Sequence, residues 1–229
     1  GKYVAYMDSD DVVPPDMYEV MFRAAERNQS DMTCCNAMRF NSSGFMDSLL
    51  HSNAMKPIHK EVNHITSDFS LLYDTTAWNK LIRVDFMKKH GFKFPEGILY
   101  EDIPVTMPMH FLANNVSIVH ENCYLWRIRE GLSKSITQTT AETTNLRDRL
   151  FVMGEVDKFY RENVDDENLH HVKNMKWLKN DLMIFINKLR SVDEHESHEL
   201  MKGMQEYVRQ NINPDDFTHL NEFDRLKYK

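Results

Sequence analysis

Two kinds of hydrophobic periodicity divide this sequence and constrain its fold more than any other feature. Over residues 1–137, short apolar runs alternate with turns and with helical patterns, whereas from Thr140 onward the pattern is helical only. Strands interleaved with helices are typical of an α/β domain. We therefore expect an α/β domain at residues 1–137, followed by an all-α extension at residues 138–229.

The predicted α/β domain contains strands and helices in alternation. Apolar runs between turn residues predict strands, and apolar positions three and four residues apart predict helices. Strands are expected at Tyr3–Met7, Asp31–Phe40, Phe45–Leu50 and Val116–Tyr124. Helices are expected at Pro14–Asn28, at Val84–His90 before a capping Gly91, and at Glu101–Asn114 with a start distorted by proline.

The predicted extension consists of amphipathic helices at Asn145–Asn163, His170–Leu189 and Glu194–Gln210, of which the last is the most charged. Apolar side chains at helical spacing mark the buried faces of the first two. These side chains are Leu146, Leu150, Met153, Val156 and Tyr160 on the first helix, and Val172, Met175, Leu178, Leu182 and Ile186 on the second. We expect these two helices to pack against each other in antiparallel orientation.

Composition excludes several classes of protein. The 28 Lys and Arg residues against 35 Asp and Glu give a net charge of -7, the opposite sign from a nucleic-acid-binding surface. A mean hydropathy of -0.57 and the lack of a long uncharged apolar run argue against a transmembrane segment, which leaves peripheral membrane association open. Three cysteines and no signal-like start favour a cytoplasmic protein.

The strongest chemical signal is the acidic sequence Asp8-Ser9-Asp10-Asp11 directly after the first apolar strand. Carboxylates packed this closely repel one another unless a cation lies among them. Oxygen ligands suit Mg²⁺ or Mn²⁺, which also bind substrate phosphates. The alternative is a solvated turn in which an Asp caps the next helix.

Two further segments carry groups suited to catalysis. Glu101 and Asp102 form a carboxylate pair that suits a general base, although either could instead cap the following helix. The segment Trp126–Thr137 contains arginines, hydroxyls and a glycine, which suit the binding of a diphosphate. An ordinary polar loop is the alternative for this segment.

These motifs occur in a specific order, as GKYVAYMDSDDVVPPDMYE, WNKLIRVDFMKKHGFKFPEGILYEDIPV and YLWRIREGLSKSIT. In combination they resemble the family 2 glycosyltransferases of GT-A fold over residues 1–137. The sequence is most similar to enzymes of Gram-positive wall polymer assembly, such as teichoic acid glycosyltransferases. Similar domains precede CDP-glycerol glycerophosphotransferase modules in bifunctional proteins.

The resemblance implies a role for each motif. Asp8 would contact the donor and, together with Asp10, hold Mn²⁺ or Mg²⁺, while Asp102 would be the general base with Glu101 beside it. The donor diphosphate would be bound by residues of the polar loop, and the choice between its two arginines stays open. The candidates are Arg127, Arg129, Ser133 and Ser135.

The implied reaction is the inverting transfer of a hexose or N-acetylhexosamine from a nucleotide-sugar, such as a UDP-sugar, to a hydroxyl of a polyol-phosphate polymer or other glycan acceptor. It would take place at the inner face of the cell membrane. Trp78 would stack on a sugar ring or else lie in the core, and Lys80 would receive the anionic acceptor.

The resemblance also shows where the sequence departs from the family. Complete domains carry a nucleotide-binding half before the acidic motif, and residues 1–137 correspond only to the part that follows it. We therefore expect this chain alone to be inactive. The alternative is a non-catalytic glycosyltransferase-like fragment, or a docking module of a bifunctional glycerophosphotransferase.

Overall fold

The computed structural model describes residues 1–130 and 143–228, which form two compact units. Residues 1–94 and 105–133 belong to an α/β unit, and residues 95–104 and 134–229 belong to a helical unit. The expected sequence of an α/β region followed by helices is confirmed. The short segment 95–104 groups with the helices, although strands precede and follow it in the sequence.

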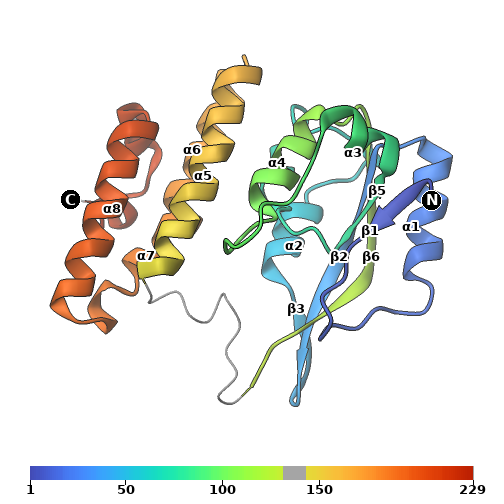
Figure 1. Ribbon diagram of the computed structural model, residues 1–229, viewed down its shortest axis with the longest axis horizontal. Coiled ribbons are helices and arrows are strands. Elements are labelled where there is room, and N and C mark those ends of the chain that lie inside the picture. The colour runs from blue at the N-terminus through green and yellow to red at the C-terminus, as the bar shows by residue number, and fades with distance from the viewer. Residues whose placement is uncertain (131–142, 229) are drawn as a thin grey trace. The chain divides into compact units, whose positions relative to one another are not determined.

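A mixed sheet forms the centre of the α/β unit (Figure 1). Its strands run in the order β1-β5-β2-β6-β4, and β3 pairs with β2 beside this path. Among the strands of the described residues, β2 and β6 are parallel and the other pairs are antiparallel. The strands are β1 (Tyr3–Ala5), β2 (Met32–Asn41), β3 (Gly44–Asp47), β4 (Val62–Asn63), β5 (Lys80–Arg83) and β6 (Val116–Arg127).

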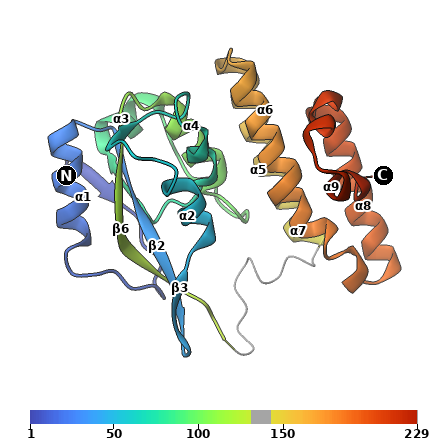
Figure 2. The ribbon, with the colours of Figure 1, turned by 180° about the vertical axis from the view of Figure 1, so that it is seen from behind.

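Helices cover both faces of this sheet. Figures 1 and 2 show α1 (Met17–Asn28) on one face and α2 (Leu49–Met55) and α4 (Ile103–Leu112) on the other. The core under α1 is made of its small and flexible side chains, such as Met17 and Met21, packed on inward-facing residues of the sheet. Helix α3 (Val84–His90) follows β5 and ends at Gly91, which has φ +67°, as the sequence predicts.

The helical unit contains α5 (Thr143–Asn163), α6 (Glu167–Lys176), α7 (Leu182–Ile186), α8 (Glu194–Asn211) and α9 (Glu222–Leu226). Helix α5 packs against α8. Most of the predicted stripe is buried, including Met153, Val156, Leu178 and Leu182. The exceptions are Leu150, Val172 and Ile186, which are only half-buried. The burial pattern therefore follows the apolar periodicity of the sequence.

The structure differs from the sequence prediction at several helices. The expected helix His170–Leu189 begins earlier, at Glu167, because the Asp166 carboxylate accepts hydrogen bonds from two backbone N–H groups. It is also interrupted by a π-helical turn at Trp177–Asp181. Helix α2 was not predicted, and neither were β4 and β5. Helix α4 begins only after Glu101 and Asp102.

Candidate functional site

The acidic residues after β1 form a turn that is bonded to β6. The Asp11 N–H donates to the Asp8 carbonyl at 3.2 Å, and the Asp8 N–H donates to the Tyr124 hydroxyl at 3.1 Å. Val12 then pairs with Leu125 through two backbone hydrogen bonds. These bonds join the acidic turn to a strand more than a hundred residues away, so its position depends on the complete sheet.

Asp11 is the supporting residue of this turn. It is 7% exposed, and its carboxylate accepts hydrogen bonds from the Tyr124 hydroxyl at 2.8 Å and from the Arg127 N–H at 2.7 Å. Burial raises the pKa of Asp11, although both hydrogen bonds act in the opposite direction. Because each carboxylate oxygen already accepts from the protein, Asp11 fastens the turn rather than presenting ligands to solvent.

Asp10 lies beside both predicted donor-binding arginines. The Arg129 Nε donates to the Asp10 carboxylate at 2.7 Å, and the Arg127 Nε donates to the Asp10 carbonyl at 2.6 Å. The hydrogen bond from Arg129 lowers the pKa of Asp10 and raises that of Arg129. The structure thus places Asp10 beside Arg127 and Arg129, an arrangement that the predicted diphosphate site requires.

Asp8 and Asp10 have the chemistry of a site for a hard divalent cation. Asp8 is exposed and Asp10 is partly exposed, so both carboxylates can be reached from solvent. Mg²⁺ is usually held by one or two carboxylates together with substrate phosphates, and the two aspartates supply that number. A cation bound to Asp10 would compete with Arg129 for the carboxylate. The Arg129 guanidinium, once displaced, would be available to a phosphate oxygen.

Ser133 and Ser135, which complete the predicted donor-binding loop, lie outside the described residues.

Trp78 lies in the core, which was the second of the two roles predicted for it. Its side chain is 7% exposed and stacks on the Tyr124 ring at a centroid distance of 4.1 Å. The His51 and Trp126 rings lie at 4.7 and 5.8 Å. Because the indole ring is covered by the protein itself, it does not present a stacking surface to a sugar.

The prediction that Lys80 contacts an acceptor is wrong. The Lys80 side chain is fully buried, and its ammonium lies 2.8 Å from the Asp74 carboxylate. It also donates to the carbonyls of Asp74 and Thr76 and to the Asn79 side chain. Lys80 is the first residue of the inner strand β5, and its side chain points into the protein. The Asp74 carboxylate, rather than a ligand, balances its charge.

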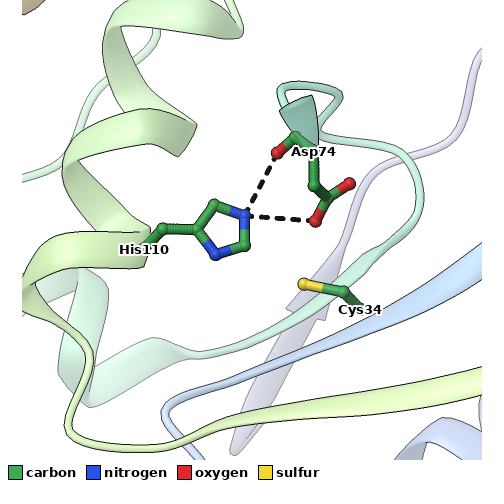
Figure 3. A group of neighbouring side chains, drawn as sticks. All are labelled: Cys34, Asp74 and His110. Carbon is green, nitrogen blue, oxygen red and sulfur yellow. Dashed lines mark hydrogen bonds and ion pairs between the residues drawn. The ribbon is translucent and has the colours of Figure 1, made fainter. Parts of the chain in front are cut away.

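The same aspartate belongs to a group of side chains that resembles a metal centre. Cys34, Asp74 and His110 offer atoms within 4.8 Å of one another, and all three are buried (Figure 3). The His110 Nε2 lies 3.1 Å from both the Asp74 carboxylate and its carbonyl. This is the kind of ligand set that Zn²⁺ prefers.

Charge balance argues against a metal at this position. Although burial alone would raise the pKa of Asp74, Lys80 and His110 together lower it well below its usual range. Burial and the nearby Asp74 carboxylate also raise the pKa of the Cys34 thiol. Lys80 already supplies the cation, and we interpret the group as a structural ion pair.

Glu101 and Asp102 lie in a tight turn of the helical unit. The turn is closed by the Ile103 N–H, which donates to the Tyr100 carbonyl at 3.1 Å, and α4 begins directly after it. Glu101 is exposed and Asp102 is half-buried. The sequence reasoning missed the residues that hold this turn, above all Arg149, which stands as a charged residue on the predicted apolar face of α5.

The α/β unit is similar to known proteins. Residues 1–91 match the family model described as glycosyl transferase family 2. This part of the α/β unit is therefore similar to family 2 glycosyltransferase domains. EpsH of Bacillus subtilis (strain 168), a glycosyltransferase by name, is 35% identical over 133 residues, which are 56% of this chain and 38% of EpsH. The poly(ribitol-phosphate) beta-glucosyltransferase of Bacillus spizizenii is 24% identical over 144 residues, which are 62% of this chain and 22% of that protein.

A solved structure confirms the fold. The crystal structure of S. aureus TarS 1-349 in complex with UDP-GlcNAc superposes with a TM-score of 0.69 at 15% sequence identity, covering 100% of this chain and 64% of TarS 1-349. The predicted GT-A-like α/β fold with its helical extension is therefore confirmed. The chain spans less than two thirds of the length of TarS 1-349 and less than half of the length of the two Bacillus relatives.

None of the helices within residues 1–130 and 143–228 combines the length and the apolar character needed to cross a bilayer.

Proposed function

We propose that the complete protein transfers N-acetylglucosamine or a related hexose from a UDP-sugar to a hydroxyl of a polyol-phosphate polymer, with inversion at the anomeric carbon. The match of residues 1–91 to the family 2 model supports the reaction class. TarS, crystallised with UDP-GlcNAc, supports the donor, and the relative that glucosylates poly(ribitol-phosphate) supports the acceptor. We propose that the reaction takes place in the cytoplasm at the inner face of the membrane, where nucleotide-sugars are available.

The observation that carries this proposal is the hydrogen bond from the Arg129 Nε to the Asp10 carboxylate. The two atoms are 2.7 Å apart, although the residues are 119 positions apart in the sequence. Two guanidinium groups beside a carboxylate turn suit a diphosphate, since arginine binds phosphate oxygens through paired N–H groups. When the donor binds, Arg127 and Arg129 would exchange their bonds with Asp10 for bonds to the diphosphate. Their charges would then stabilise the leaving group as the glycosidic bond breaks.

A divalent cation, held by Asp10 with Asp8, would supply further neutralisation of the diphosphate charge when it is bound. Asp102 would accept the proton of the acceptor hydroxyl as its oxygen attacks the anomeric carbon. The UDP leaves from the opposite side, so that the new bond has inverted configuration. Glu101 would help to orient the acceptor or the turn.

The test uses the complete protein with UDP-GlcNAc, Mn²⁺ and poly(ribitol phosphate). Asp102→Asn keeps the shape of the side chain and removes its basicity, so transfer should fall about 10²–10⁴-fold while UDP-GlcNAc affinity survives. Asp85→Asn, at an exposed position of α3, is the matched control and should retain activity. Transfer by Asp102→Asn within about threefold of the wild type would remove Asp102 from the mechanism.

The metal role is tested separately. Asp10→Ala should abolish Mn²⁺-dependent turnover, and EDTA should do the same in the wild type. Full wild-type turnover in EDTA would show that the arginines alone neutralise the diphosphate. The 229-residue chain by itself is expected to bind UDP-GlcNAc weakly.

A further inference from the structure

The turn that carries Glu101 and Asp102 has an unusual backbone. Tyr100, its first residue, has φ +65°, in the left-handed region that side chains other than glycine rarely adopt. Such a conformation persists only where surrounding contacts hold it, and it is concentrated at functional sites. The contacts of Tyr100 therefore show what keeps this turn in place.

Helix α5 supplies these contacts, all within the helical unit. The Tyr100 hydroxyl donates to the Asn145 side-chain oxygen at 2.5 Å, and the Arg149 guanidinium lies 3.6 Å from the centre of the Tyr100 ring. The Leu99 N–H donates to the Asp148 carboxylate at 3.1 Å. Three side chains from one turn of α5 thus hold two consecutive residues immediately before Glu101.

Arg149 is itself held by a buried charge network. Its guanidinium donates to Asp181 at 3.0 Å, and the second carboxylate oxygen of Asp181 accepts from Lys176 at 2.8 Å. The side chains of these three residues are 4–9% exposed. Lys176 directly precedes the π-helical turn at Trp177–Asp181, and Asp181 is its last residue. Such irregularities are frequent at functional sites.

The network also acts on Asp102. Burial lowers the pKa of Lys176, while the carboxylates of Asp181 and Asp102 both act in the opposite direction.

We propose that Tyr100, Asn145 and Arg149 are positioning residues for sugar transfer, because they fix the turn that carries Asp102. This inference rests on the proposed function, in which Asp102 is the general base. It assigns the helical extension a part in catalysis: α5 and the π-helical turn set the orientation of the base, although they need not touch the substrate.

The main test is Arg149→Met in the complete protein. Methionine preserves most of the buried volume, and Asp181 keeps Lys176 as its partner, so the fold is expected to survive. Misplacement of a catalytic group by about 1 Å can cost about 100-fold in rate, so kcat for transfer to poly(ribitol phosphate) should fall about 10–100-fold. The KM for UDP-GlcNAc should stay unchanged, because the donor site belongs to other residues.

Two comparisons separate positioning from general destabilisation. Arg149→Lys keeps a cation between Asp181 and the Tyr100 ring, and it should recover most of the lost kcat. Arg161→Met changes the same residue type on the same helix at an exposed position, and it should behave as wild type. Thermal unfolding of each variant shows whether it is folded at the assay temperature.

A milder variant covers the case in which Arg149→Met fails to fold. Tyr100→Phe keeps the ring under Arg149 and removes only the hydroxyl bond to Asn145. Loss of one hydrogen bond should lower kcat about 2–10-fold, again with unchanged KM for UDP-GlcNAc.

Asp102→Asn is measured in parallel so that the outcomes can be distinguished. If Asp102→Asn loses transfer and the Arg149 and Tyr100 variants lose kcat selectively, the inference holds. If Asp102→Asn loses transfer while folded Arg149→Met or Tyr100→Phe keeps the wild-type kcat, or loses donor affinity instead, the inference is overturned and the proposed function stands. If Asp102→Asn keeps transfer, the proposed function fails and the inference fails with it.

Discussion

The two units of this protein use charged side chains in opposite ways. In the α/β unit, the Asp10–Arg129 pair at the candidate donor site is 33% and 43% exposed. In the helical unit, the Arg149–Asp181–Lys176 network beside the Glu101–Asp102 turn is at most 9% exposed. An exposed pair can exchange its partners for those of a ligand at little cost, whereas a buried network cannot. The first arrangement suits binding, and the second suits positioning.

The Asp74–Lys80 pair shows that burial, rather than the unit, decides the role. It lies in the same unit as Asp10 and Arg129, yet both of its side chains are 0% exposed. It joins β5, the loop before it and α4, through Lys80 and His110. The following measurements compare the loss of a buried charge, a buried apolar side chain and a buried neutral side chain with the loss of an exposed charge.

The largest effect is expected when one member of the buried pair is removed. Lys80→Met leaves the Asp74 carboxylate buried without its main cation, which should lower the unfolding free energy by about 3–5 kcal/mol. Chemical denaturation measures this loss. The double variant with Asp74→Leu should be more stable than Lys80→Met alone, because no charge is then left buried. A double variant that is less stable than the single one would contradict the charge explanation.

An apolar reference in the helical unit comes next. Leu182 is completely buried, and Leu182→Ala should lower the unfolding free energy by about 2–5 kcal/mol through lost burial and a cavity. Leu226→Ala is the matched control, since Leu226 is 56% exposed. A loss below about 0.5 kcal/mol for Leu182→Ala would show that this face of α7 is not part of the core.

A buried neutral side chain gives a pH-dependent effect of intermediate size. Burial lowers the pKa of His51 from 6.5 to about 4, while its ring nitrogens bond to Ser48 and Thr76. The unfolded state takes up a proton near pH 6.5 and the folded state only near pH 4, so stability is lost as the pH falls through this range. The loss should reach about 3 kcal/mol.

The measurement for His51 is the unfolding free energy between pH 7 and pH 4. His51→Gln should have a flatter pH profile than the wild type, whereas His59→Gln, at an exposed position, should not. Identical slopes in the wild type and His51→Gln would mean that another group titrates.

The smallest effect on stability is expected at the exposed pair. Arg129→Met should leave the unfolding free energy unchanged within error, because solvent screens an exposed ion pair. The same variant should raise the KM for UDP-GlcNAc about tenfold, as a charge-assisted contact with the diphosphate is lost. Arg23→Met, which removes another exposed arginine, is the control for both measurements. Loss of stability without a change in KM would place Arg129 with the structural charges.

Local patterns predicted the elements whose ends are set by neighbouring residues. The helix Val84–His90 and its Gly91 cap agree with the structure, because glycine adopts positive φ without a steric penalty. The π-helical turn at Trp177–Asp181 could not be predicted in this way. Its apolar residues keep the spacing of an ordinary α-helix, so the sequence pattern gives no sign of it. The feature that marks the π-helical turn in the structure is the buried contact between Lys176 and Asp181.

The sequence by itself determined the acidic motif, the change from alternating strands and helices to helices alone, and the resemblance to family 2, because these depend on residues close together in the chain. Only the tertiary structure decided which charges face inward. From the sequence, Lys80 is expected at the surface, whereas in the structure it is buried beside Asp74 at the start of β5. Arg149 has a role only through its contact with Tyr100, 49 residues earlier. The physical reason is that a charge acts according to its burial and its partners. The partners of Lys80 are close to it in the sequence, but its burial depends on the pairing of β5 with β1 and β2, whereas the partners of Arg149 come from distant segments.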